Sequence, residues 1–128
     1  MVKQVTQNIE VAVIPKFEKS HPVVGNVLYV FSYHVTITNN SDYTVRLLRR
    51  HWHIFDSIGE WKEVEGEGVI GVQPLLEPGQ SHSYQSGSHL ISGLGSMYGT
   101  YQMERQVDNE LFDINIPKFR LEAPFFVN

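Results

Sequence analysis

The 128-residue sequence contains no cysteine. This absence excludes disulfide bonds, a thiolate nucleophile and cysteine-ligated metal sites, and it fits a reducing compartment. The sequence also lacks the apolar N-terminal segment of a signal peptide, and no hydrophobic run reaches the length of a membrane span. We therefore expect a soluble, cytoplasmic protein that does not insert into a membrane.

Positive charge is scarce as well. Ten Lys and Arg residues stand against fourteen Asp and Glu residues, for a formal net charge of −4. A mildly acidic chain argues against nucleic acid as the partner. The charges are unevenly distributed, because Arg49 and Arg50 are followed shortly by Glu63, Glu65 and Glu67. Solvated faces explain both clusters without any ligand.

No segment of the sequence shows apolar residues at helical spacing, whereas in several segments apolar residues recur at every second position. The clearest is VLYVFSYHVTIT, residues 27–38, in which every odd position is apolar or aromatic. This pattern is typical of a half-buried strand. Similar short segments recur between turn signals, so we expect one all-β domain over residues 1–128. Its expected architecture is an antiparallel β-sandwich of about seven to eight strands.

Three positions predict irregularities in these strands. We expect Pro15 to interrupt the first strand and the last strand to reach only Pro117, because proline cannot donate a ladder hydrogen bond. Between Leu47 and Leu48 the apolar phase of the segment 45–56 changes. Such a change indicates a β-bulge or a strand that switches sheets.

The segment GEGVIG, residues 66–71, has the G-x-G-x-x-G spacing of dinucleotide-binding sites. That motif requires a helix that begins at its last glycine and an acidic residue about twenty positions later. Pro74 and Pro78 prevent such a helix, and the Lys and Ser or Thr of a phosphate-binding P-loop are missing. The context therefore excludes both nucleotide-binding motifs.

Two interpretations of Gly66, Gly68 and Gly71 remain open. Their amides could form a concave nest that binds a phosphate, with Arg49 or Arg50 as the countercharge. Alternatively, the three glycines only adopt positive φ angles in a bulged connection.

Apolar side chains are unusually frequent in this loop, at Val69, Ile70, Leu75 and Leu76. They either close the open end of the sandwich or form a contact patch for a partner.

His51 and His53 are two residues apart on a predicted strand, so their rings face the same side. Such a pair can supply two metal ligands, and a third could come from a neighbouring strand. The candidates for this third ligand are His34, His82 and His89. Because no spacing completes a ligand set, we expect no metal cofactor, and His51 and His53 are only candidates.

Catalytic motifs are absent too. The sequence has no G-x-S-x-G elbow and no H-E-x-x-H motif. We therefore expect no enzymatic activity, no catalytic residue and no cofactor.

Five blocks of the sequence resemble, in order, the ApaG family. They are RHWHIFD (50–56), EVEGEGVIGVQPLLEPGQ (63–80), YQSG (84–87), MYGTYQM (97–103) and IPKF (116–119). The resemblance covers nearly the whole chain and implies a fibronectin type III-like or immunoglobulin-like sandwich. It implies no established enzymatic activity, an association with cobalt resistance and magnesium efflux, and a role as a protein-binding module.

Two details of the resemblance concern candidate sites. It implies pyrophosphate-like ligands at the glycine motif, which here is Gly66, Gly68 and Gly71. His53 departs from the family pattern after the His–Trp pair, so a metal role for His53 does not follow from the resemblance.

Our first interpretation is a non-enzymatic module that binds another protein. The expected surface is the apolar glycine loop together with Arg49, Arg50 and His51, or an exposed sheet edge. The first alternative is a small phosphate-containing anion held by the loop amides and Arg50. The second alternative is a divalent metal ion held by His51 and His53.

Overall fold

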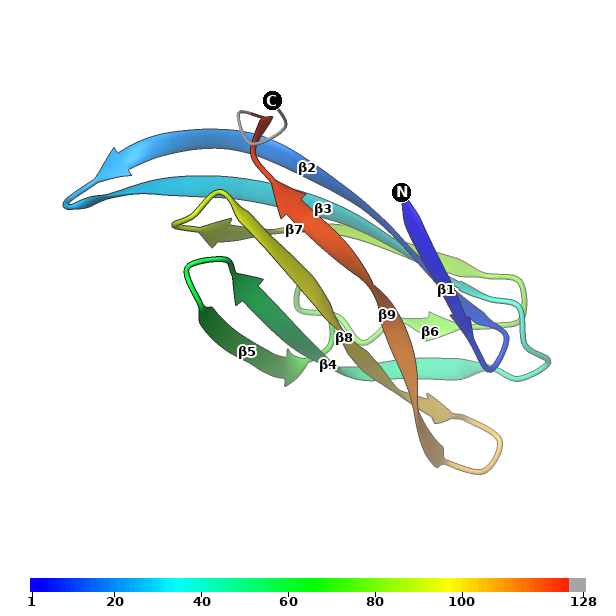
Figure 1. Ribbon diagram of the computed structural model, residues 1–128. Helices are drawn as coiled ribbons and strands as arrows, with labels where there is room; N and C mark the ends of the chain where they lie inside the picture. Colours follow the sequence, from blue (N-terminus) through cyan, green and yellow to red (C-terminus); the bar gives the residue numbers. More distant parts are fainter. Residues whose placement is uncertain (125–128) are drawn as a thin grey trace.

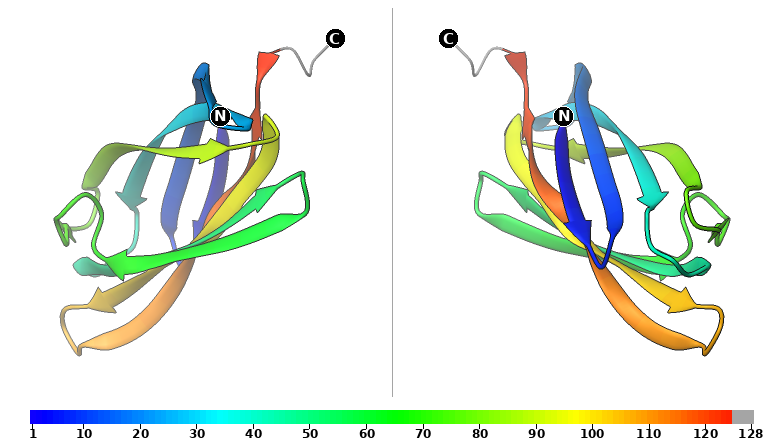
Figure 2. Two further views of the ribbon diagram at one scale, coloured as in Figure 1. Left: turned by 90° about the vertical axis from the view of Figure 1, so that its left-hand side faces the viewer. Right: turned by 90° about the vertical axis from the view of Figure 1, so that its right-hand side faces the viewer.

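The computed structural model describes residues 1–124, which form two antiparallel β-sheets packed face to face (Figures 1 and 2). The strands are β1 (Val2–Thr6), β2 (Ile9–Val23), β3 (Asn26–Asn39), β4 (Val45–Asp56), β5 (Glu60–Glu67), β6 (Leu75–Leu76), β7 (Ser81–Leu90), β8 (Leu94–Arg105) and β9 (Glu110–Glu122). The predicted antiparallel β-sandwich is confirmed, with β1 and β6 as short strands that the periodicity did not indicate. No helix in residues 1–124 is long and apolar enough to cross a bilayer.

The first sheet has the strand order β1-β2-β3-β7, and the second has the order β5-β4-β8-β9. The short strand β6 pairs with the start of β4, beyond the end of β5. Strands β1 and β2 contact β9, which closes one side of the sandwich. On the other side, β7 and β5 are the edges of their sheets, and the loop that follows β5 lies between them (Figure 2).

Apolar side chains at alternate positions of the strands form the core. A cluster of aromatic side chains at the centre of this core joins the two sheets. Trp52 on β4 is only 2% exposed. Its ring centroid lies 5.2 Å from that of Tyr33 on β3, 5.9 Å from that of Phe119 on β9 and 6.5 Å from that of Tyr101 on β8. Large aromatic side chains contribute much of the apolar area that a small domain buries.

The expectation that Pro15 interrupts the first strand is wrong. Strand β2 continues through Pro15, which pairs with Tyr33. Its pairing with β1 ends at Val13, so Pro15 lies where β2 has become an edge strand and needs no second ladder partner. Strand β9 likewise continues past Pro117, because the register shifts there and a bulge accommodates the proline.

The predicted irregularity in β4 is a β-bulge. Leu47 pairs with Met103 and Arg49 pairs with Gln102, so Leu48 is the extra residue. Before the bulge the odd positions face the core, and after it the even positions do. Arg50 and Trp52 therefore face the interior of the sandwich, whereas Arg49 faces its outer surface.

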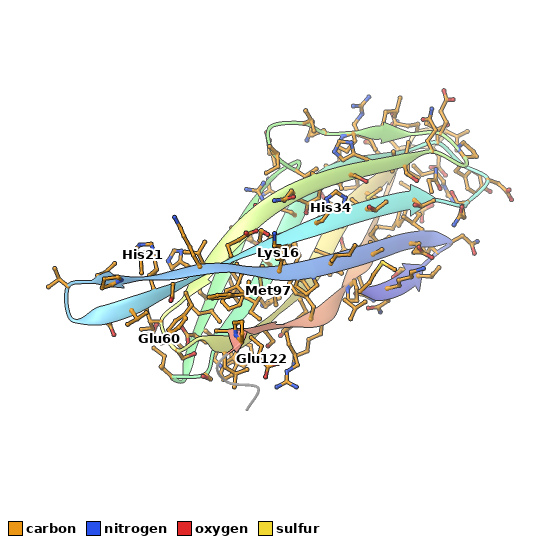
Figure 3. The ribbon with its side chains drawn as sticks, turned by 90° about the horizontal axis from the view of Figure 1, so that it is seen from above. Lys16, His21, His34, Glu60, Met97 and Glu122 are labelled. Carbon is orange, nitrogen blue, oxygen red and sulfur yellow. The ribbon has the colours of Figure 1, made fainter. Side chains whose placement is uncertain are left out.

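Strands β2 and β3 form a long hairpin that projects beyond the rest of the sandwich (Figure 1). Figure 3 shows His21 near the free end of this hairpin and His34 farther along β3. His82 and His89 lie on β7 in the same sheet. These histidines therefore belong to the sheet opposite His51 and His53.

Candidate functional site

The glycine loop, residues 66–76, is held against the bulge of β4. The Leu48 carbonyl accepts a hydrogen bond from the Gly68 amide at 2.8 Å and another from the Gln73 side-chain amide at 2.9 Å. Arg46 donates to the Gln73 carbonyl at 2.8 Å. These hydrogen bonds therefore fix the loop to β4, and its position depends on the extra residue in this strand.

A tight turn forms the tip of the loop. The Val69 amide donates to the Val72 carbonyl at 2.8 Å, and the Val72 amide donates back at 3.2 Å. Ile70 and Gly71 at the centre have φ angles of +47° and +76°. Positive φ at both central residues is the type I′ geometry, in which Asn-Gly is preferred and a β-branched residue is strained.

The three motif glycines have two different roles. Gly68 and Gly71 adopt positive φ, as one interpretation expected. For Gly66 that interpretation is wrong, because Gly66 lies within β5 and its φ angle is not positive. A Cβ on Gly66 would lie 2.8 Å from Nη1 of Arg50, so this glycine leaves room for the guanidinium.

Most of the expected amide nest is already occupied. The amides of Gly68 and Val69 donate to backbone carbonyls, as does that of Val72. Within residues 1–124, the loop amides left without a hydrogen-bond partner at the tip are those of Ile70 and Gly71. An anion at the loop would therefore meet two amides instead of a complete nest.

The apolar loop residues divide between the core and the surface. Val69 and Leu76 are 1% and 3% exposed and pack into the core at the open side of the sandwich, which removes them from the candidate contact surface. Ile70 and Leu75 are 62% and 43% exposed, and Val72 is exposed beside them. The first interpretation therefore holds for Val69 and Leu76, whereas the exposed side chains of Ile70, Val72 and Leu75 remain candidates for a contact surface.

Arg50 faces inward beside this loop. Its Nη1 donates to the carbonyls of Glu67 and Gly68 at 3.0 and 3.1 Å. Within residues 1–124 its guanidinium forms no ion pair with a carboxylate. It lines a cavity of about 200 Å³ whose walls also include Tyr33, Tyr84 and the loop tip.

Tyrosine hydroxyls form the inner part of this region, and sequence reasoning did not identify them. Tyr84 and Tyr101 share a short hydrogen bond between their hydroxyls. Burial raises the pKa values of Tyr33, Tyr84 and Tyr101. For Tyr33, a hydrogen bond with Ser86 and the charge of Arg50 partly offset this increase in pKa. The inward positions of β7 before Leu90 carry His, Tyr and Ser in place of aliphatic residues, which was the available signal.

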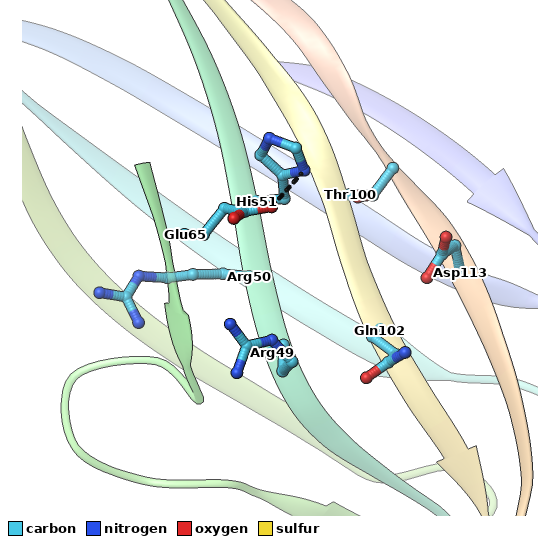
Figure 4. A pocket seen from close by; sticks show the side chains of 7 residues that line it. All are labelled: Arg49, Arg50, His51, Glu65, Thr100, Gln102 and Asp113. Atoms are coloured by element: carbon cyan, nitrogen blue, oxygen red, sulfur yellow. Dashed lines mark ion pairs between the residues drawn. The ribbon is translucent and has the colours of Figure 1, made fainter. Parts of the chain in front are cut away.

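The predicted group of Arg49, Arg50 and His51 comes together at one outer hollow, although the Arg50 guanidinium also binds carbonyls of the glycine loop. All three residues line this hollow of about 160 Å³, together with Thr100 of β8 and Asp113 of β9 (Figure 4). His51 Nδ1 lies 3.1 Å from Oε1 of Glu65. Arg50 therefore borders both this outer hollow and the cavity beside the glycine loop.

His51 and His53 share the outer face, as expected, with ring centroids 4.5 Å apart. The third potential ligand is the carboxylate of Glu63, and the ligand atoms of this group lie within 4.8 Å of one another. The expectation of a third histidine is wrong, because His34, His82 and His89 lie on the opposite sheet.

The buried tyrosines predict a loss of stability in alkali. Each has a pKa above the ordinary tyrosine value of 10.0, so the unfolded chain releases phenolic protons that the folded chain retains. The contribution of these tyrosines to folding stability is fully present below pH 10. It decreases as the pH rises through their higher folded-state pKa values. Urea unfolding at a series of pH values measures this decrease.

Phenylalanine variants test whether the buried tyrosines cause this loss of stability at high pH. Tyr84→Phe and Tyr33→Phe should each reduce the slope of the unfolding free energy against pH, because each removes a buried phenol with a raised pKa. Equal slopes in all three proteins would contradict the assignment.

Comparison with known proteins agrees with this architecture. Residues 19–105 match the family model described as the ApaG domain. Protein ApaG of Paramagnetospirillum magneticum is 46% identical over 124 residues, covering 97% of this chain and 95% of the relative. Protein ApaG of Sinorhizobium fredii is 42% identical over 127 residues, covering 99% of this chain and 97% of the relative.

Two solved structures share the fold. A structural-genomics crystal structure has a TM-score of 0.87 and 37% identity, covering 91% of this chain and 88% of the other. A crystal structure from Bordetella pertussis has a TM-score of 0.80 and 35% identity, with coverage of 91% and 94%. With its two-sheet sandwich, its glycine loop and these matches over nearly its whole length, the chain belongs to the ApaG family.

Proposed function

We propose that this chain is a non-enzymatic module that binds another protein through the exposed apolar side chains of the glycine loop. The observation that carries the proposal is the backbone of Ile70, which is left-handed at φ +47°. Such a conformation costs a β-branched residue about 1–3 kcal/mol, and Asn would avoid most of this cost. A strained isoleucine with an exposed side chain is costly for folding, but it provides an apolar anchor for a partner.

The surroundings of Ile70 favour a partner of particular chemistry. Ile70, Val72 and Leu75 are exposed on a loop that several hydrogen bonds fix to β4 and its bulge. A preorganised loop loses little conformational entropy on binding. Arg46 and Arg50 bind loop carbonyls and form no ion pair within residues 1–124. We therefore propose a partner segment with apolar side chains and nearby carboxylates.

A second candidate function is the binding of a small phosphate-containing anion in the Arg50 cavity. The inward guanidinium without a carboxylate partner favours it. Tyr33, Tyr84 and the amides of Ile70 and Gly71 line the same cavity or lie at its rim. These groups are hydrogen-bond donors, and a guanidinium with donors around it is suited to phosphate oxygens.

The protein-binding proposal predicts that Ile70→Asn acts on stability and binding in opposite directions. Asn tolerates positive φ, so the free energy of unfolding should rise by about 1 kcal/mol. Binding of the partner should be lost, because the apolar anchor is removed. The control is Ile58→Asn, since Ile58 is 49% exposed in the turn between β4 and β5, away from the loop.

Affinity capture followed by measured affinities with each recovered protein distinguishes the outcomes. The expected partner binds the wild-type chain and the Ile58→Asn variant but not the Ile70→Asn variant. Equal affinity of every recovered protein for all three chains would contradict the proposal.

The anion candidate predicts saturable amide shifts on titration with pyrophosphate, followed by NMR at low and moderate salt. The shifts should centre on Ile70, Gly71 and Arg50 and decrease with added salt, because charge pairing is screened. Tyr33→Phe should weaken the binding, and Tyr98→Phe on the outer face should not. Ile70→Asn keeps the turn and should leave this binding intact, which separates the two functions. Absence of saturable shifts at the loop would contradict this candidate.

A further inference from the structure

The outer face of the second sheet carries a compact group of two histidines and two carboxylates. The ladder between β4 and β5 pairs His51 with Glu65 and His53 with Glu63. Paired residues of an antiparallel ladder point to the same side, so all four side chains share one surface. This surface lies on the opposite side of the sheet from the Arg50 cavity.

Short distances separate the imidazole nitrogens and the carboxylate oxygens of this group. Oε1 of Glu63 lies 3.1 Å from Nε2 of His51 and 3.3 Å from Nδ1 of His53. Nδ1 of His51 lies 3.1 Å from Oε1 of Glu65. His51 therefore has a carboxylate oxygen at each of its two ring nitrogens.

A neutral imidazole ring cannot satisfy this arrangement by itself. It carries one N–H, so one nitrogen of His51 would direct its lone pair at a carboxylate oxygen. Either a second proton or a metal ion at that nitrogen removes the repulsion. If the ring proton is on Nδ1, beside Glu65, the free lone pair is on Nε2, which faces Glu63 and His53.

The distances suit a metal ion on the Nε2 side. Zinc ligands lie about 2.0–2.2 Å from a tetrahedrally coordinated ion, which separates neighbouring ligand atoms by about 3.3 Å. The two distances from Glu63 to the imidazole nitrogens, 3.1 and 3.3 Å, are close to this separation. Glu65 then takes the position of the second carboxylate that orients a ligating histidine in many zinc sites.

We propose that His51, His53 and Glu63 bind a divalent transition-metal ion, with Glu65 as a positioning residue that orients His51. Two imidazoles and one carboxylate favour Zn²⁺, Co²⁺, Ni²⁺ or Cu²⁺ over Mg²⁺ and Ca²⁺. Three protein ligands leave one tetrahedral position open to water.

Neighbouring side chains surround the two histidines of this site. Tyr98 of β8 stacks on His53 with ring centroids 4.9 Å apart and an interplanar angle of 16°. His51 lines the outer hollow next to Arg49 and Thr100 (Figure 4). The ring of His53 is thus supported on one side, while the open position of the metal has access to solvent.

Calorimetric titration of the untagged full chain with Zn²⁺, and visible absorption with Co²⁺, test the proposal. One ion per chain should bind, with the intense absorption of four-coordinate Co²⁺. Paramagnetic loss of amide signals should centre on His51, His53 and Glu63 in the wild-type protein, which needs no variant. Excess Mg²⁺ should not compete.

Variants then assign the ligands. The double variant His51→Gln/His53→Gln should lose binding, and Glu65→Gln should weaken it by about 10–100-fold. The matched control is His34→Gln, an exposed histidine on the opposite sheet, which should bind as the wild type does. Absence of the Co²⁺ absorption in the folded wild-type protein would overturn the proposal. So would metal binding that persists in the double variant.

Discussion

The extra residue in β4, at Leu48, is the constraint on which both candidate surfaces depend. It shifts the side-chain phase, so that Arg50 and Trp52 face the interior while His51 and His53 face outward. The Leu48 carbonyl also accepts the hydrogen bonds from Gly68 and the Gln73 side chain that hold the glycine loop. Bulges are frequent next to functional sites because they redirect side chains in this way.

Burial and strain are balanced within the glycine loop. Val69 and Leu76 are buried, and each such side chain stabilises the fold by about 1.5–3 kcal/mol. The left-handed backbone of Ile70 costs about 1–3 kcal/mol, so the two buried neighbours offset it. The fold can therefore keep a strained, exposed isoleucine at the tip of a well-anchored loop.

The sequence alone predicted the features that depend on local periodicity. The alternation of residues 27–38 predicted β3, and the change of phase at Leu48 predicted the bulge. The other features depend on which strands pair, in which register, and on how the two sheets pack. Pro15 is tolerated because the pairing of β2 with β1 ends at Val13, and no local signal shows where a neighbouring strand ends. Glu63 and Glu65 meet the two histidines only because of the β4–β5 register, and the tyrosines approach Arg50 only because the sheets pack.

Residue-resolved amide hydrogen exchange of the glycine loop tests most directly whether the bulge holds this loop in place. The structure predicts that the amides of Gly68, Val69 and Val72 exchange slowly, because each donates to a backbone carbonyl. The amides of Ile70 and Gly71 should exchange fast, since neither donates a hydrogen bond within residues 1–124. Fast exchange at all five positions would show a loop that is not anchored to Leu48, and it would contradict the account of both the apolar surface and the Arg50 cavity.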